Sequence, residues 1–143
     1  MTDADSLKFV LPQGWARAKG FSYGVMAADR DVLCVAGQLA VENGAAAPPP
    51  GLGMADQFVK SLENVVAIVR AAGGQPSDIA ALRVFVTDIG AYKADQPAIA
   101  VGWRRVIGAH FPAMTMVEVG ALYEETAMVE IEAIALLRKE VVP

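Results

Sequence analysis

Two segments near the end of the chain, residues 110–119 and 128–137, alternate apolar residues with polar or small ones. A period of two is typical of β-strands whose two faces meet different surroundings. The connection between them, residues 120–127, contains three consecutive polar side chains, which predicts a solvated loop. We therefore expect the two segments to be neighbouring antiparallel strands.

The length of 143 residues suits one domain with a sizeable core. We expect this domain to span residues 1–143, with its core at about 20–138. Residues 1–19 would form an N-terminal arm or edge strand, and residues 43–53 a loop rich in Pro, Gly and Ala. Hydrophobic residues make up 55% of the chain, and such an excess suggests subunit interfaces, which resemble a core cut in half.

Composition also argues against several classes of protein. The net charge is −4 and no basic stripe is present, which disfavours a nucleic-acid partner. No apolar run approaches the roughly 20 residues of a membrane span. One cysteine and one histidine exclude an intrachain disulfide and a zinc constellation. Because the first residues lack the features of a signal peptide, we expect a cytoplasmic protein without metal or cofactor.

The first half of the chain contains a hairpin pattern. Residues 20–25 and 32–40 are typical of strands, and the turn between them would lie at 29–31. The second strand is almost wholly apolar, so we expect it to be central and covered on both faces, with Cys34 in the core. Gly37 within it indicates a bulge or the close approach of another backbone.

Helical periodicity follows the loop. Apolar residues at helical spacing predict an amphipathic helix from Met54 to the glycines that follow Ala72. Residues 82–87 alternate into another strand, and a strand, helix and strand in succession favour parallel pairing of the flanking strands. A second helix should run from about Tyr92 to Ile107, with Pro97 near its first turn.

Six motifs give the chain a strong resemblance to a known family. The motifs are Gly37-Gln38, residues 71–74, residues 84–88, residues 111–113, residues 117–119 and residues 129–135. Their order and spacing resemble those of the Rid (reactive intermediate deaminase, YjgF) family, also called endoribonuclease L-PSP, over roughly residues 20–138. The resemblance implies an α+β, chorismate-mutase-like fold, with a mixed sheet of about six strands and two helices on one face. It also implies a homotrimer with ligand clefts between subunits.

Deaminase members of that family hydrolyse enamines and imines such as 2-aminoacrylate. Their Pro-Ala-Arg motif uses the arginine to hold the substrate carboxylate through a bidentate pair. This chain has Met114 at that position, so it resembles a divergent member, and a thioether cannot make such a pair. The glutamate that positions water in those members matches Glu130.

The resemblance implies further cleft residues. The family's cleft tyrosine falls at Phe21 or Tyr23, and its cleft asparagine at Gln96 or Pro97. Met116 lies on the same strand face as Met114, so both methionines are candidates to line an apolar pocket. Simple core filling is the alternative interpretation of this methionine pair.

The charged candidates also have structural interpretations. Glu130 either orders a water for attack on an imine carbon or bonds to backbone or arginine at a subunit interface. Glu118 and Glu132 would pair with arginines, of which Arg83, Arg104 and Arg105 are the candidates. The two arginines on the second helix either hold an anionic ligand in the cleft or form a solvated face. His110 is either an acid or base, or a loop cap.

Two functions follow as hypotheses. The first is a Rid-like hydrolase of enamines or imines, acting on a small metabolite in an inter-subunit cleft, with a substrate range altered by Met114. The second is a non-catalytic trimer that binds a small metabolite or a protein. Acidic charge and the lack of a histidine pair argue against ribonuclease activity.

Overall fold

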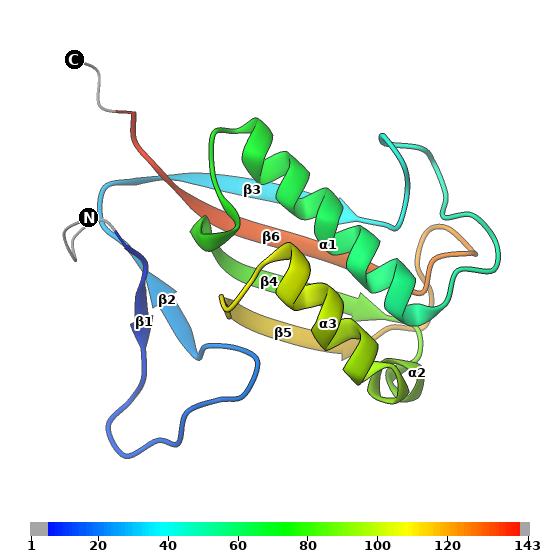
Figure 1. Ribbon diagram of the computed structural model, residues 1–143, viewed down its shortest axis with the longest axis horizontal. Coiled ribbons are helices and arrows are strands. Elements are labelled where there is room, and N and C mark those ends of the chain that lie inside the picture. Colours follow the sequence, from blue (N-terminus) through cyan, green and yellow to red (C-terminus); the bar gives the residue numbers. More distant parts are fainter. Residues whose placement is uncertain (1–5, 141–143) are drawn as a thin grey trace.

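The computed structural model describes residues 6–140 (Figure 1). The first five residues of the predicted N-terminal arm, where the sequence shows no signal-peptide features, therefore lie outside the described residues. Within them the chain forms, in order, β1 (Lys8–Val10), β2 (Gly24–Met26), β3 (Arg30–Gln38), α1 (Met54–Ala71), a 3-10 turn (Pro76–Asp78), β4 (Ile79–Val86), α2 (Ile89–Ala94), α3 (Gln96–Val106), β5 (Ala113–Glu118) and β6 (Val129–Arg138).

The main sheet has four strands in the order β3-β6-β4-β5. β6 runs antiparallel to both β3 and β4, whereas β4 and β5 are parallel. The prediction that residues 110–119 and 128–137 are neighbours is therefore wrong, because β4 lies between β5 and β6. The expected parallel pairing across α1 is also wrong, since β6 is inserted between β3 and β4. Parallel pairing occurs instead across the second helical crossover, from β4 to β5.

The predicted hairpin between residues 20–25 and 32–40 does not form. β2 pairs with β1 in a separate two-stranded sheet, which extends beside the main sheet in Figure 1. The chain turns at Asp29, which has a φ of 51°, and then enters β3. Alternation alone does not identify the partner of a strand. β1 has only three residues, which is too short a pattern to predict that it pairs with β2.

The helices lie on one face of the main sheet (Figure 1), as predicted. The core is formed by the apolar stripe of α1, the inner side of α3 and alternate residues of β4 and β6. Phe58, Leu62 and Val65 of α1 are fully buried. A Cβ on Gly102 of α3 would overlap the side chain of Val59, so a glycine at this position lets α1 and α3 approach closely.

The predicted helix over residues 92–107 is two helices. α2 ends before Asp95, and α3 begins at Gln96 with Pro97 in its first turn, as expected for proline. The Asp95 carboxylate accepts a hydrogen bond from the backbone N–H of Ala55 at 3.1 Å, which ties this break to the start of α1. Of the helices in the described part of the chain, none is long and apolar enough to cross a bilayer.

The other face of the sheet is open in a single chain. β3 is an edge strand, so the prediction that it is central and covered on both faces is wrong. Cys34 is exposed rather than part of the core, and Val32 is 65% exposed. The expected bulge at Gly37 is confirmed, because the register with β6 shifts between Val35 and Gln38.

Candidate functional site

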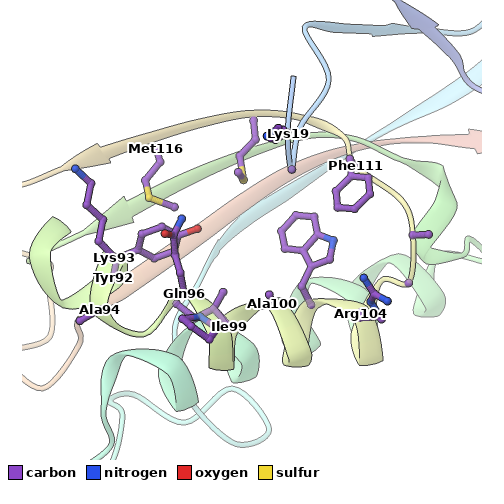
Figure 2. A pocket seen from close by; sticks show the side chains of 16 residues that line it. Lys19, Tyr92, Lys93, Ala94, Gln96, Ile99, Ala100, Arg104, Phe111 and Met116 are labelled. Atoms are coloured by element: carbon purple, nitrogen blue, oxygen red, sulfur yellow. The ribbon is translucent and has the colours of Figure 1, made fainter. Parts of the chain in front are cut away.

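A groove of about 980 Å³ runs between α3 and β5. The α2–α3 corner closes one end of it, and the loop that leads into β5 lies at the other (Figure 2). It is lined by Lys19, Gly20, Tyr92, Lys93, Ala94, Gln96, Pro97, Ile99, Ala100, Trp103, Arg104, Gly108, Ala109, Phe111, Met114 and Met116.

Two methionines of β5 form the floor of the groove. In the parallel pairing with β4, Met114 lies opposite Leu82 and Met116 opposite Val84. Leu82 and Val84 are buried under the helices, so both methionines face the helix side of the sheet. They are partly buried. The predicted residues Met114, Met116 and Gln96 are thus brought together in one groove, with Pro97, the other candidate for the cleft asparagine.

An aromatic pair forms the wall of the groove at the end where the loop leads into β5. The rings of Trp103 and Phe111 are nearly parallel, at 8°, with centroids 6.2 Å apart. The indole N–H of Trp103 donates to the backbone carbonyl of His110 at 3.2 Å, which fixes the plane of the indole. Trp103 is buried, whereas Phe111 is 39% exposed, so a ligand can contact the phenyl ring.

Positive charge surrounds this apolar groove. Lys19, Lys93 and Arg104 contribute to its lining, which includes no carboxylate. Within residues 6–140 none of these three cations has an acidic side chain as a salt-bridge partner. The groove also contains the phenol of Tyr92, whose pKa is raised by burial and lowered, to a smaller extent, by its hydrogen bond with Gln96. Tyr92 is therefore a neutral hydroxyl at physiological pH.

Glu130 is placed elsewhere. It pairs with Phe85 in the antiparallel register of β6 and β4, between Val129 and Ile131, which are buried beneath the helices. Its side chain therefore faces the open side of the sheet. It lies over Gly37 of β3, where an added Cβ would overlap the carboxylate. A single chain thus separates Glu130 from Met114 by one strand and by the thickness of the sheet.

The two aromatic candidates near the N-terminus lie beside the start of β5. Ser22 forms a bridge with Ala113, and its hydroxyl donates to the carbonyl of Phe111 at 2.6 Å. Phe21 and Tyr23, on either side of Ser22, contact each other edge to face with centroids 5.6 Å apart. Neither lines the groove, so the structure places them next to the methionine strand but outside the groove.

The remaining strand carboxylates have structural partners. Glu118 accepts a hydrogen bond from the backbone N–H of Ile89 at 3.0 Å and so binds the start of α2, rather than an arginine. Glu132 pairs with Arg83 at 2.8 Å, which is one of the predicted pairings. Arg105 pairs with Glu63 at 2.9 Å and lies outside the groove, in contrast to Arg104.

His110 is partly buried and does not line the groove. Its Nε2 lies 2.6 Å from the carbonyl oxygen of Ile79, and its ring meets Phe9 edge to face. Burial lowers its pKa, and the Ile79 carbonyl and the charge of Asp78 act in the opposite direction. No cluster of His, Cys, Asp and Glu among residues 6–140 could hold a metal ion.

Sequence reasoning missed several residues of the groove. Lys19 lies in a segment without regular structure, and Lys93 lies in a six-residue helix. Neither residue belongs to a sequence pattern that could predict that its side chain lies near β5. Trp103 and Phe111 were not among the predicted cleft residues. Phe111 belongs to the Phe-Pro-Ala motif of residues 111–113, and this was the one signal that could have suggested a role in the groove.

Comparison with known proteins identifies the family. Residues 15–137 match the family described as Endoribonuclease L-PSP. A 2-iminobutanoate/2-iminopropanoate deaminase of Salmonella typhimurium is 43% identical over 82 residues, which cover 57% of this chain and 62% of that protein. The protein of the same name from Escherichia coli is 36% identical over 108 residues, covering 76% of this chain and 81% of that protein.

A crystal structure supports the same assignment. The YyfB protein of the conserved Rid family from Yersinia pestis superposes with a TM-score of 0.78 at 29% identity, covering 92% of this chain and 99% of that protein. The predicted chorismate-mutase-like α+β fold is thereby confirmed, with the six strands divided between two sheets. The chain belongs to the endoribonuclease L-PSP family, which includes the Rid proteins.

Proposed function

We propose that this chain is a deaminase that hydrolyses enamines or imines of small metabolites, with Glu130 as the carboxylate that orders the attacking water. Two relatives named 2-iminobutanoate/2-iminopropanoate deaminase support the reaction class. Protonation of the enamine carbon gives an iminium ion, to which water adds at carbon. Glu130 accepts a proton from this water. Loss of ammonia from the resulting carbinolamine leaves a carbonyl product.

The state of the Glu130 carboxylate carries the proposal. It is partly buried, yet no hydrogen bond or ion pair from residues 6–140 engages it. Glu118 and Glu132, the other two strand carboxylates, are bound to Ile89 and Arg83. A carboxylate that lies on a strand, half withdrawn from solvent and without a protein partner, can hold a water molecule.

Met114 supports an altered substrate range. A thioether offers the substrate carboxylate neither charge nor N–H donors, so an imino acid loses the bidentate pair that an arginine would give. The groove around Met114 is apolar and large. We propose that the preferred substrate is bulkier than 2-iminobutanoate and gains affinity from apolar contact.

The separation of Glu130 from the groove supports an assembly. Because the two lie on opposite faces of one sheet, a cleft that contains both needs a second subunit. The open face carries exposed apolar side chains, including Val32 at 65% and Val117 at 42%, which would be covered in an oligomer. We propose a cytoplasmic homotrimer in which Glu130 of one subunit meets the groove of its neighbour.

The test is ammonia release from a panel of freshly generated imines, with Glu130→Gln and Glu132→Gln compared. Both changes remove one charge from the same face of β6, but Glu132 already pairs with Arg83. The proposal expects Glu130→Gln to lower kcat by about a hundredfold or more and Glu132→Gln to leave it within about twofold. Undiminished turnover in Glu130→Gln would refute the assigned role.

The missing arginine also supports a second candidate, a non-catalytic trimer that binds a small metabolite or a protein. It differs from the first in one outcome. If no imine in the panel releases ammonia above the rate in buffer, while calorimetry detects a ligand, the binding function stands and the hydrolase does not. Ammonia release that depends on Glu130 excludes it.

A further inference from the structure

We propose that the groove binds elongated aromatic carboxylates, and that Arg104 holds the anion in place of a charged residue at position 114, while Lys19 and Lys93 add positive charge elsewhere in the groove. These three residues are called the groove cations below. The inference deepens the proposed function, since it names the class of acid that the groove accepts. Its test measures binding rather than turnover, so either proposal can fail without the other.

The charge distribution is the first support. The chain carries a net charge of −4, yet the groove is lined by three cations and no carboxylate. The nearest arginine in sequence, Arg105, is neutralised by Glu63. The groove cations have no such partner within residues 6–140. The electrostatic potential in the groove therefore favours an anionic ligand, although the net negative charge of the whole protein does not.

The position of the cations fixes the shape of the ligand. Figure 2 shows Lys93 and Met116 toward one end of the groove, and Phe111 and Arg104 toward the other. Gln96 and Arg104 lie eight residues apart along α3, which corresponds to about 12 Å of helix. An acid held at one end must therefore extend along the methionine floor to fill the groove. A three- or four-carbon acid is too short for this.

The walls specify a flat apolar body. Trp103 and Phe111 present nearly parallel rings, and the phenyl ring is partly exposed. Met114 and Met116 supply polarizable thioethers, which make favourable contacts with aromatic rings. An aromatic ring inserted here gains contact from both the floor and the wall, and a guanidinium at Arg104 can hold its carboxylate through two N–H groups.

Isothermal titration calorimetry with 2-naphthoate, naphthalene-2-carboxamide and butanoate tests the proposal on the full chain. The amide has the shape of the naphthoate without its charge, and butanoate has the charge without the ring. We expect naphthoate to bind about tenfold or more tightly than either. A charged acceptor makes stronger hydrogen bonds than the neutral amide, and the ring buries apolar surface that butanoate lacks. Equal affinity for naphthoate and its amide would overturn the proposal.

Matched variants locate the binding site. Arg104→Gln should weaken naphthoate about tenfold, whereas Arg105→Gln, its neighbour outside the groove, should leave the affinity unchanged. Lys19→Gln and Lys93→Gln should weaken naphthoate less than Arg104→Gln does, because these lysines add positive charge to the groove without holding the carboxylate themselves. Naphthoate binding that survives all three groove-cation changes, or that Arg105→Gln weakens equally, would show that the anion binds elsewhere.

Discussion

Gly37 and Glu130 lie face to face on two paired strands, and the carboxylate of Glu130 occupies the space where any other residue at 37 would place its Cβ. Gly37 belongs to the bulge of β3, where the register with β6 shifts. Its φ lies outside the left-handed region, so the backbone itself would accept alanine. The glycine is needed for the space that its missing side chain leaves to Glu130.

Gly37→Ala should therefore displace Glu130 without unfolding the protein. A Cβ at this position would lie 2.7 Å from the carboxyl carbon, and the flexible glutamate side chain can move away. We expect the kcat for imine hydrolysis to fall toward that of Glu130→Gln, with little change in the midpoint of urea denaturation. Full activity in Gly37→Ala would show that the observed position of Glu130 is not needed.

Met114→Arg should restore hydrolysis of short imino acids. Met114 lies on the floor of the groove, where a guanidinium could form a bidentate pair with a substrate carboxylate. We expect kcat/KM for 2-iminobutanoate to rise by about tenfold or more, measured by ammonia release. Met114→Leu is the matched control, because it retains an apolar side chain of similar size. A gain in Met114→Leu would assign the effect to shape rather than charge.

Arg30 should contribute far more to stability than Arg83. Arg30 pairs with Asp78 at 3.3 Å and both side chains are at most 10% exposed, so Arg30→Gln would leave a buried carboxylate without its counter-ion. The expected loss is about 3–5 kcal/mol. Arg83 is 61% exposed in its pair with Glu132, and Arg83→Gln should cost less than about 1 kcal/mol. Urea denaturation of both variants checks the difference.

Two buried polar residues on α1 should respond in opposite ways to apolar substitution. The Gln57 amide donates to the carbonyls of Leu52 and Thr126 and accepts from the N–H of Met128. Gln57→Leu leaves these backbone groups unsatisfied and should cost at least about 2 kcal/mol. The fully buried Ser61 hydroxyl has no hydrogen-bond partner among residues 6–140, so Ser61→Ala should be neutral or stabilising by up to about 1 kcal/mol. Equal losses in the two variants would contradict this account.

His110 should make the fold less stable in mild acid. Burial lowers its pKa below the ordinary value of 6.5, so the folded chain holds the neutral ring, whose Nε2–H donates to Ile79. Below about pH 6.5 the unfolded chain binds the extra proton more readily, and stability falls as the pH drops through the folded pKa. His110→Gln keeps a donor and does not titrate. Its unfolding free energy should decline less between pH 7.5 and pH 5.5 than that of the unchanged protein.

Much of the fold could be predicted from local pattern. α1 begins at the predicted Met54, and β6 is offset by one residue from the predicted 128–137. The errors concern pairing. Nothing in the alternation of β5 and β6 shows that β4 lies between them, because pairing depends on contacts between residues distant in sequence. The exposure of Cys34 was mispredicted for a related reason, because the apolar composition of β3 does not show that this strand lies at the edge of the sheet.

The candidate site could be predicted only in part. Met114, Met116 and Gln96 were found through a motif and a strand period, and they do line the groove. Lys19 and Lys93 could not be found, because a lysine in a loop or short helix carries no periodic signal. Alternation along each strand shows which residues share a face with Glu130 or with Met114. Only the order and register of the strands show that these two faces are opposite.

The close contact between Gly102 and Val59 has a consequence on the far side of α3. That helix forms one wall of the groove, and its distance from β5 depends on how far it can recede toward α1. The missing side chain of Gly102, on the side of α3 that faces α1, thus helps to set the width of the groove on the other side of α3. Selection for larger or smaller guests can therefore act on a residue that never touches them.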